Sequence, residues 1–345
     1  MTDSPLVLVA NAKDGSIATF RLEGGELTRL AVTEGITGCS TFAIDADRDL
    51  VYAAVKGAAE GENPGILTLA LDRETGVLAP RTRLDIPDGS LNYIALTHGG
   101  TGLLAASYGG GYGFSARITD GVVSAPVSEL RHANLHSVLP SADGAHAYFV
   151  SLGEDLVAQF AIGEDMTLTP LAQPTVAAPE GVGPRHLQFN AAGDTVYVLT
   201  EFTAEVLRFA RAATGELTLL DATPAADPSR GLRRSAFGLD PRENHAIWGA
   251  DLHWGADERV LWASERCEST LGGLAVAPDG SLSAPAHFTD TEPQPRGFAL
   301  SPDGAHLVAA GERSTTVSLY AVNGDVLTLL QQAETGNGAN WVRFV

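Results

Sequence analysis

The stretch Pro295-Arg-Gly-Phe-Ala-Leu-Ser-Pro-Asp-Gly-Ala-His-Leu-Val-Ala-Ala310 consists of two short apolar segments joined by a tight turn. The turn residues Ser301-Pro-Asp-Gly304 end one strand and start the next, because proline and glycine supply the backbone angles that a tight turn requires. Related turns, each between two short apolar segments, end at Arg48, Gly100, Gly144, Gly193 and Glu258. The same strand–turn–strand unit therefore repeats along the chain.

The spacing of these turns identifies the repeating unit. Successive turn ends lie 52, 44, 49, 65 and 46 residues apart, and a four-stranded propeller blade takes about 40–50 residues. The six turns therefore predict six blades. The stretch from Leu6 to about Leu30 contains three further strands without an innermost one, and Trp341-Val-Arg-Phe-Val345 is a single strand without a blade. Joining the two ends gives a seventh blade and leaves no sheet edge open.

We therefore predict an all-β fold, a seven-bladed β-propeller, that forms one domain over residues 1–345, with a terminal blade closed by the N- and C-terminal strands. The alternative is a sandwich or two packed β-domains, but neither requires so regular a repeat. The 65-residue spacing places an insertion at about Asp221 to Ala246, which contains Arg230, Arg233, Arg234 and Arg242. We expect the insertion beside the ligand site; a solvated loop or a subunit contact is the alternative.

Composition and charge exclude several classes of partner. The chain has 345 residues, of which 44% are hydrophobic and 19% charged, and its formal net charge is −20. A nucleic acid or an anionic membrane surface is therefore not expected as a partner. An apolar run of about 18 residues and the basic segment of a signal peptide are both missing. Two cysteines, Cys39 and Cys267, are too few for a disulfide framework, which favours the cytoplasm. No feature sets the oligomeric state.

The repeat also predicts which residues share a site, since the start of a blade's first strand and the end of its second lie on one face of the ring. Counting eight residues back from each turn end gives the start positions Ser40, Asn92, His136, Arg185, Ala250 and Arg296, and Asn340 precedes the closing strand. Counting eight forward gives the end positions Lys56, Tyr108, Leu152, Glu201, Arg266 and Glu312. A group of arginines in so acidic a protein indicates an anionic ligand. The alternative is a set of ordinary solvated loop residues.

No metal and no cofactor are predicted. His132 and His136 have the i, i+4 spacing of zinc-binding helices, but the glutamate beside the first histidine is missing and the pair precedes a strand. Gly109-Gly-Gly-Tyr-Gly113 lacks the lysine and the hydroxyl of a P-loop. The Gly-x-Ser-x-Gly motif of serine hydrolases is absent.

Seven short motifs spread along the chain carry a resemblance to a known family. They are Asn134-Leu-His-Ser-Val138, Gly183-Pro-Arg-His-Leu187, Thr200-Glu201, Ala250-Asp-Leu-His253, Glu265-Arg266, Pro295-Arg-Gly-Phe298 and Gly338-Ala-Asn-Trp341. Together they resemble the seven-bladed propeller lactonases, which include a bacterial 6-phosphogluconolactonase type and the fungal 3-carboxymuconate lactonising enzyme. The proposed catalytic residues of the fungal relative match His136, Arg185, Glu201 and Arg266.

The resemblance implies hydrolysis of a small anionic sugar lactone, with 6-phosphogluconolactone as the first candidate. Opening a lactone needs an activated water, a stabilised oxyanion and a proton for the leaving ring oxygen. Glu201 is the predicted general base, Arg185 and Arg266 are expected to hold the substrate anion or the oxyanion, and His136 is expected to donate the proton. Either Glu201 or His136 can serve as the base.

The predicted substrate-binding residues are Lys56, Asn92, Tyr108, His186 and Arg296. Two alternatives for the function stay open. One is a cycloisomerase of carboxylated muconates that uses the same residues, and the other is a propeller that serves as a binding scaffold without catalysis.

Overall fold

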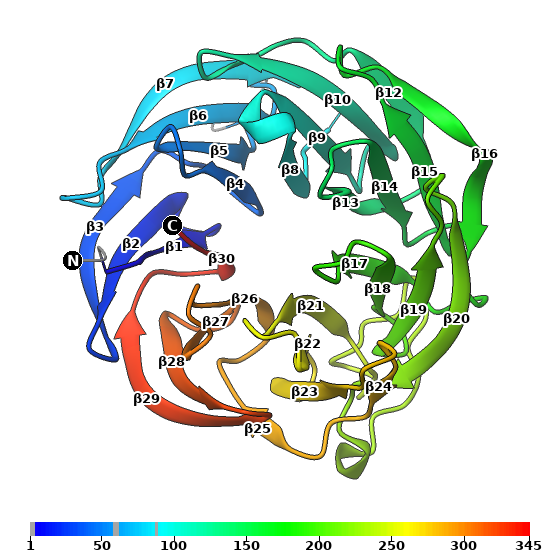
Figure 1. The fold of residues 1–345 in the computed structure, drawn as a ribbon. Coiled ribbons are helices and arrows are strands. Elements are labelled where there is room, and N and C mark those ends of the chain that lie inside the picture. Colours follow the sequence, from blue (N-terminus) through cyan, green and yellow to red (C-terminus); the bar gives the residue numbers. More distant parts are fainter. Residues whose placement is uncertain (1–3, 58–61, 87–88) are drawn as a thin grey trace.

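Seven antiparallel sheets surround a central channel in the computed structural model, which describes residues 4–57, 62–86 and 89–345 (Figure 1). We number these sheets as blades 1 to 7 in chain order. The innermost strand of each blade faces the channel and the outermost lies on the perimeter (Figure 1). The all-β, seven-bladed propeller predicted from the sequence is confirmed.

The strands of each blade follow one another from the channel outward. Blade 1 has β30 (Ala339–Phe344), β1 (Leu6–Asn11), β2 (Ser16–Glu23) and β3 (Glu26–Glu34), and blade 2 has β4 (Phe42–Asp45), β5 (Leu50–Val55), β6 (Gly65–Leu71) and β7 (Leu78–Asp85). Blade 3 has β8 (Tyr93–Thr97), β9 (Gly102–Ser107), β10 (Tyr112–Thr119), β11 (Val122–Val123) and β12 (Ser128–Arg131). Blade 4 has β13 (Leu135–Pro140), β14 (His146–Ser151), β15 (Leu156–Ile162) and β16 (Leu168–Ala177).

The remaining blades have the same arrangement. Blade 5 has β17 (Pro184–Phe189), β18 (Thr195–Thr200), β19 (Glu205–Arg211) and β20 (Leu217–Pro224). Blade 6 has β21 (Gly249–Trp254), β22 (Val260–Glu265), β23 (Thr270–Val276), β24 (Leu282–Ser283) and β25 (Phe288–Asp290), and blade 7 has β26 (Pro295–Leu300), β27 (His306–Gly311), β28 (Thr316–Asn323) and β29 (Val326–Glu334). Two short 3₁₀ helices are η1 (His98–Gly100) and η2 (Pro228–Arg230). Within the described ranges, no helical segment has the length and hydrophobicity of a membrane span.

The outermost strand is divided in two of the blades. In blade 3 it splits into β11 and β12 around Pro126, and in blade 6 into β24 and β25 around Pro285. Proline has no N–H to donate to a strand ladder and is tolerated on sheet edges. Prolines do not always divide the outermost strand, since β7 contains Pro80 and β16 contains Pro170 and Pro174 without a break.

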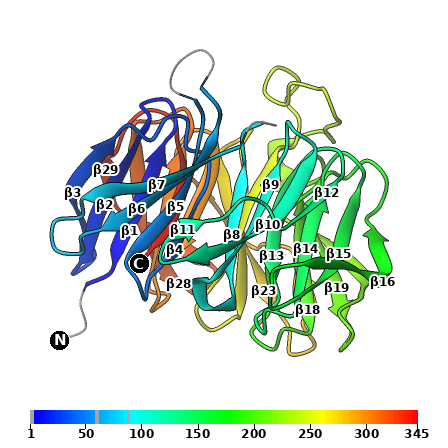
Figure 2. The ribbon, with the colours of Figure 1, turned by 90° about the horizontal axis from the view of Figure 1, so that it is seen from above.

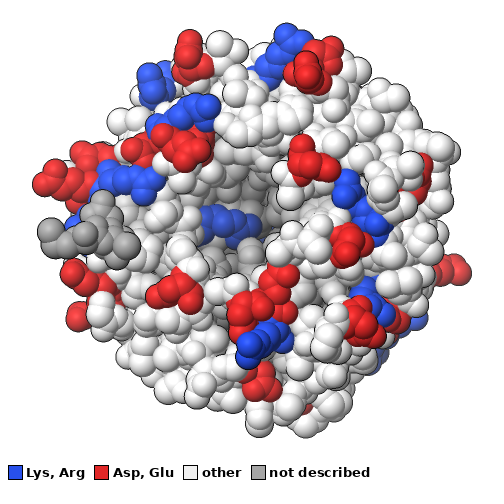
Figure 3. All heavy atoms as spheres, in the orientation of Figure 1, with Lys and Arg blue, Asp and Glu red and all other residues white. Residues whose placement is uncertain are grey.

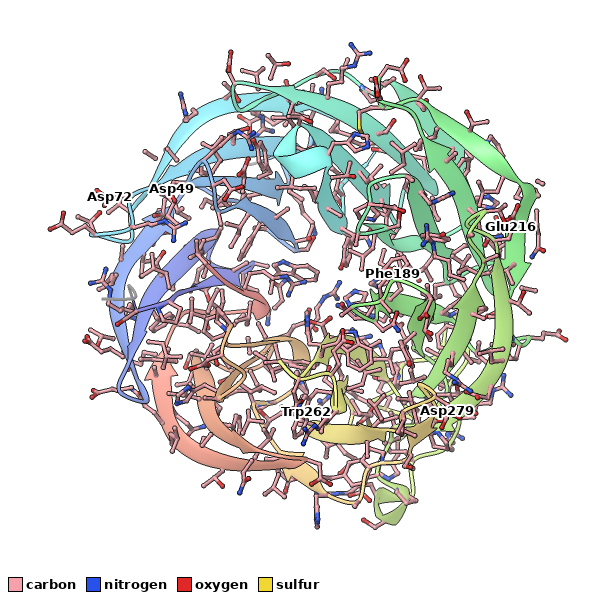
Figure 4. The ribbon with its side chains drawn as sticks, viewed as in Figure 1. Asp49, Asp72, Phe189, Glu216, Trp262 and Asp279 are labelled. Atoms are coloured by element: carbon pink, nitrogen blue, oxygen red, sulfur yellow. The ribbon has the colours of Figure 1, made fainter. Side chains whose placement is uncertain are left out.

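The hydrophobic core lies between the faces of neighbouring blades. All residues of β5 and β9 are buried, whereas in the outermost β7 only Leu78 is buried and the other residues are exposed or half-buried. The inner strands are covered on both faces and therefore read as continuous apolar runs. Trp262 of β22, labelled in Figure 4, packs with Phe298 and Leu307 between blades 6 and 7.

The two chain ends form blade 1 together, as predicted. β30 lies beside the channel and pairs with β1 in an antiparallel register that includes Val7 with Phe344 and Val9 with Val342. The Trp341 side chain is 2% exposed, and its Nε1 donates to the carbonyl of Phe42 in blade 2 at 2.9 Å. The terminal strand therefore joins blade 1 to its neighbour as well as closing the ring.

Removal of Trp341–Val345 is expected to abolish soluble, folded protein. The deletion takes away most of β30 and exposes the edge of β1, and burial of the tryptophan alone is worth about 3–5 kcal/mol. Trp341→Phe is the control, because it keeps the strand ladder and loses one hydrogen bond. We expect the control to lower the melting temperature by a few degrees. A truncated chain that stays monomeric with an unchanged melting temperature contradicts closure by β30.

Candidate active site

One mouth of the channel opens into a cavity of about 610 Å³. The predicted start and end positions line this cavity except for Leu152, Arg185 and Ala250. The residues come from all seven blades, so the ring architecture itself assembles the site. A cavity of this size accommodates a small metabolite.

Bulges in the innermost strands position several of these side chains. The pairing register between first and second strands skips one residue at His136, at Arg185 and at Arg296, and the pairing of β30 with β1 skips Asn340. The skipped residue in each strand is a predicted start position. A bulge leaves one residue out of the ladder and turns its side chain. At His136, Arg296 and Asn340 the bulged residue lines the cavity, whereas the bulged Arg185 lies below the cavity surface.

Glu201 is held by three donors at the cavity wall. Its Oε2 accepts from Arg185 Nε at 2.9 Å and from Arg266 Nη2 at 3.0 Å. Its Oε1 accepts from Trp248 Nε1 at 3.3 Å. The guanidinium of Arg266 also stacks on the Trp248 ring, 3.7 Å from the centroid. Because both arginines bind the same oxygen, Oε1 is the oxygen left with bonding capacity toward the cavity.

His136 is buried beside this group and stays neutral. Burial, and then the charge of Arg185, lower the pKa of His136 well below its ordinary value. Its Nδ1 has no hydrogen-bond partner among the described residues. A buried N–H without an acceptor is costly, so the proton belongs on Nε2, the nitrogen that can meet a ligand in the cavity. The main chain of His136 is fixed by Asn92, whose Nδ2 donates to the His136 carbonyl.

A second layer of polar residues fixes Arg185 from behind. Arg185 Nη1 donates to the Ala250 carbonyl and contacts His186 Nε2 at 3.1 Å, and His186 Nδ1 lies 2.8 Å from Asp251 Oδ1. Burial and the charge of Arg185 lower the pKa of His186 to about 3. A neutral His186 that donates from Nδ1 to Asp251 accepts from Arg185 at Nε2. Asp251 therefore sets the tautomer that orients the guanidinium.

The cavity at the opposite mouth of the channel has a different lining. Figure 3 shows that face, with charged side chains of both signs around a central hollow. A cavity of about 380 Å³ there is lined by apolar residues such as Trp341, and Arg343 is the only ionised side chain that the described part of the chain contributes to its lining. Among the described residues, the lining of that cavity contains no carboxylate, in contrast to the lining that contains Glu201 and Glu312.

A family model, that of the seven-bladed β-propeller lactonases, matches residues 7–344 of the chain. The chain belongs to this lactonase family. Two curated relatives are the 6-phosphogluconolactonase of Cronobacter sakazakii, 26% identical over 342 residues with 97% of each chain covered, and that of Serratia proteamaculans, 29% identical over 349 residues with 99% of this chain and 98% of the relative covered. Among solved structures, the periplasmic gluconolactonase of Pseudomonas aeruginosa superposes with a TM-score of 0.86 at 24% identity over 99% of each chain.

In this lactonase-family propeller, most of the predicted site residues surround one cavity. His136, Glu201 and Arg266 line it, as do the predicted substrate-binding residues Lys56, Asn92, Tyr108 and Arg296. Arg185 and His186 lie one layer deeper and are absent from the described lining. Their side chains contact blade 6 instead, where Arg185 Nη1 donates to the Ala250 carbonyl and His186 Nδ1 lies beside Asp251 Oδ1.

Three charged or aromatic residues in the described lining of the cavity were not among the predicted site residues of this lactonase. Trp248 follows the insertion and does not occupy a start or end position of the repeat. Counting along the repeat therefore could not predict its contacts with Glu201 and Arg266. Glu312 was an end position, and its Oε1 accepts from Arg296 Nη1 at 3.5 Å. Lys13 follows β1, the second strand of blade 1. The first strand of this blade, β30, comes from the other end of the chain, so no turn joins the two strands. Counting from turn ends therefore could not predict Lys13.

The histidine pair considered for zinc does not converge. His132 Nδ1 lies 2.7 Å from Glu154 Oε2, whereas His136 faces the cavity. His245, Cys267 and Glu268 instead bring possible ligand atoms within 4.8 Å of one another beside the insertion. Only His245 of these three residues is exposed, and none of them lines the cavity that contains Glu201.

The insertion of this lactonase lies on the cavity face, as predicted. Ser235 N donates to the Phe202 carbonyl at 2.9 Å and Arg234 Nη2 to the Glu180 carbonyl at 2.8 Å, which anchors the insertion over the loops next to Glu201. Figure 2 shows it projecting from the end of the ring opposite the N-terminus. Arg230 is paired with Asp227 and Asp290 and is therefore largely neutralised.

Proposed function

We propose that this protein hydrolyses a sugar lactone and that 6-phosphogluconolactone is its first candidate substrate. The observation that carries the proposal is the Glu201 carboxylate, oriented by two buried arginines and Trp248 at the wall of a cavity with a neutral histidine. A fixed carboxylate beside hydrogen-bond donors is the arrangement that water-dependent opening of an ester requires. The family membership supports the same reaction.

In the proposed reaction, Oε1 of Glu201 takes a proton from a water whose oxygen attacks the lactone carbonyl carbon. The Nε2–H of neutral His136 donates a hydrogen bond to the carbonyl oxygen, which becomes the oxyanion. The bond between the carbonyl carbon and the ring oxygen then breaks, and the proton on Glu201 moves to that oxygen. The product is a hydroxy acid, which releases one proton to solvent. His136 acts here as a hydrogen-bond donor, because its lowered pKa removes the proton that direct acid catalysis needs.

The two arginines have separate parts in this scheme. Arg266 lines the cavity and can reach the substrate, whereas Arg185 is fully buried and holds Glu201 in place. Burial lowers the pKa of Arg185 to about 9 and that of Arg266 to about 10, so both remain charged near neutral pH. The two guanidinium groups fix Oε2 of Glu201 and leave Oε1 oriented toward the cavity.

Proton release by the purified protein tests the proposal. A panel of phosphorylated, unphosphorylated and carboxylated lactones is mixed with the protein in weak buffer, and the acid formed is followed with a pH indicator. Catalysed acid release from a sugar lactone supports the proposal. Formation of a lactone from a carboxylated muconate without hydrolysis identifies a cycloisomerase, and binding without any turnover identifies a scaffold.

We also propose the cytoplasm as the site of action. The two cysteines are free thiols, and Cys39 is buried where its pKa is raised to about 12, which leaves it inert. A protein without disulfides suits a reducing compartment. Fractionation of cells that carry a C-terminally tagged protein tests this, and recovery from a periplasmic extract contradicts it.

The insertion is expected to steer an anionic substrate. Arg230 is already paired with carboxylates. The test variant therefore replaces three other arginines of the insertion with glutamine, namely Arg233, Arg234 and Arg242. Arg230→Gln is the matched control. We expect kcat/KM of the triple variant to fall about threefold near 10 mM salt, with the difference closing near 150 mM, where charges are screened within about 8 Å. An unchanged kcat/KM at every salt concentration removes the insertion from substrate capture.

A further inference from the structure

We propose that Lys13 and Lys56 form a binding subsite for a phosphate monoester dianion, on the wall of the cavity opposite Glu201. This inference rests on the proposed lactone hydrolysis and names the feature of the substrate that the cavity selects. Lys13 and Lys56 are the only two lysines in the 345-residue sequence, and both line this one cavity. The sequence has 22 lysines and arginines in total, so the remaining 20 are arginines.

The two lysines occupy equivalent places in adjacent blades. Lys13 follows the second strand of blade 1, β1, and Lys56 follows the second strand of blade 2, β5. The main chain of each is tied to the segment that leads into the innermost strand of its own blade: Lys13 N donates to the Asn337 carbonyl at 3.2 Å, and Lys56 N to the Thr37 carbonyl at 2.8 Å. The ring therefore places the two lysines in neighbouring blades at the same mouth of the channel.

A glycine makes room for each lysine side chain. A Cβ atom at Gly338 would come within 2.6 Å of Lys13 Cγ, and one at Gly38 within 2.8 Å of Lys56 Cδ. Both glycines have positive φ, +73° and +58°, which residues with a Cβ rarely adopt. Each aliphatic chain thus lies against bare backbone at the cavity mouth. The same device in two blades gives the ammonium groups a defined approach to the cavity.

These ammonium groups differ from the other cations of the site in their pairing. In the described part of the chain, neither lysine has an ion-pair partner, and Asp14 beside Lys13 accepts from the main chain and side chain of Asn337 instead. The cavity arginines, in contrast, are bound to carboxylates: Arg266 to Glu201 and Arg296 to Glu312. Without a carboxylate partner in the described part of the chain, the two lysines leave two positive charges for a ligand.

The charge distribution of the whole protein favours a dianion at this place. The net charge is −20, and acidic side chains such as Asp72, Glu216 and Asp279 lie toward the perimeter of the ring (Figure 4). A local excess of positive charge inside an acidic surface attracts and retains an anion selectively. An ordinary carboxylate carries one charge, whereas a phosphate monoester carries nearly two at pH 7 and matches both lysines.

The position of the subsite fits a ligand that spans the channel mouth. Blades 1 and 2, with β1 and β5, stand across the channel from blades 5 and 6, with β18 and β22 (Figure 1). Glu201 follows β18 and Arg266 follows β22. A lactone whose carbonyl lies at Glu201 therefore directs its far end toward the lysines, and the cavity of about 610 Å³ holds such a molecule. The phosphate on that far end is the group that the lysines recognise.

The test uses the Lys13→Gln/Lys56→Gln double variant and two substrates, 6-phosphogluconolactone and gluconolactone. We expect the ratio of kcat/KM for the phosphorylated over the unphosphorylated lactone to fall about 100-fold, since two charge-assisted contacts are lost. The Lys13→Arg/Lys56→Arg variant is the matched control and should keep most of the wild-type ratio. A ratio that stays the same in the glutamine variant, or an equal loss with both substrates, overturns the subsite.

A binding measurement separates this inference from the proposed reaction. Calorimetry with 6-phosphogluconate and gluconate as probes needs no turnover. Wild-type protein should bind the phosphorylated acid at least about tenfold more tightly, and the glutamine variant should lose that preference. If the preference is present but no lactone is hydrolysed, the subsite stands and the hydrolytic function fails. If wild-type protein binds both acids equally, the subsite is wrong even where hydrolysis is observed.

Discussion

Glu201→Gln is expected to lower kcat about 1,000-fold while KM changes less than about threefold. The glutamine side chain has the size of glutamate, and its carbonyl oxygen can still accept from Arg185 or Arg266. It cannot take a proton from water, so the loss falls on the chemical step, where a general base contributes about 10²- to 10⁴-fold. Steady-state kinetics on the best lactone of the panel gives both constants.

The controls for this variant address its fold. Two buried arginines lose the charge of their partner, and removing one member of a buried ion pair is destabilising. The melting temperature is therefore measured alongside, and Glu201→Asp, which keeps the charge on a shorter side chain, should lose less activity than the glutamine variant. Glu312→Gln is the matched change at the other cavity carboxylate, with an expected loss below about tenfold. A folded Glu201→Gln protein with near-full kcat assigns the base to His136.

The fold could be predicted because propeller blades repeat in sequence. Each hairpin between first and second strands has its own turn residues, as at Ser301–Gly304, and the strands between them are short and apolar. The period of the repeat predicted the number of blades. The single strand at the C-terminus was expected to complete the N-terminal blade, and it pairs with β1. The same counting brought His136, Glu201 and Arg266 to one channel mouth, because equivalent positions of a ring converge.

The depth of each residue in the site could not be predicted, because it depends on bulges. A bulge at Arg185 leaves no composition signal in Gly183-Pro-Arg-His-Leu187, yet it decides that the arginine bonds Ala250 and Glu201 below the cavity surface. Contacts between blades were equally hidden. In the sequence Asp251 stands out only as a neighbour of His253, and its link to His186 crosses from blade 6 to blade 5. Pairings of this kind depend on how the blades pack, which the repeat does not encode.

Arg185→Lys is expected to lower kcat about 100-fold and to make the remaining activity sensitive to pH. The guanidinium donates to Glu201 from Nε and to the Ala250 carbonyl from Nη1, while Nη1 also meets His186. A lysine has one ammonium group at the end of a flexible chain and cannot hold these positions together. Glu201 then loses the donor that fixes its Oε2, and the base is no longer aligned with the water.

The pH dependence follows from burial. Burial, reinforced by the charges of Arg266 and Arg296, lowers the pKa of Arg185 to about 9 from 12.5. The ordinary pKa of a lysine side chain is lower than that of an arginine, so the same surroundings would bring the pKa of a lysine at this position below that of Arg185. The charged form exists below that pKa, and therefore activity of the variant should fall as pH rises from about 6 to about 9, whereas the wild type keeps its arginine charged over most of this range. Rates of lactone hydrolysis, corrected for the uncatalysed reaction at each pH, give the two profiles.

Arg259→Lys is the matched control, because Arg259 is exposed and its partner Asp257 lies on the surface. An exposed pair of this kind contributes little, and the substitution should leave the profile of the wild type in place. If Arg185→Lys retains full kcat with a flat profile, then neither the forked contact nor the permanent charge of Arg185 is needed, and the layer formed by Asp251 and His186 supports folding alone. If kcat falls but the pH profile of the variant is flat, the forked contacts of Arg185 are needed for catalysis. The loss of charge at high pH is then not the cause of the lower activity.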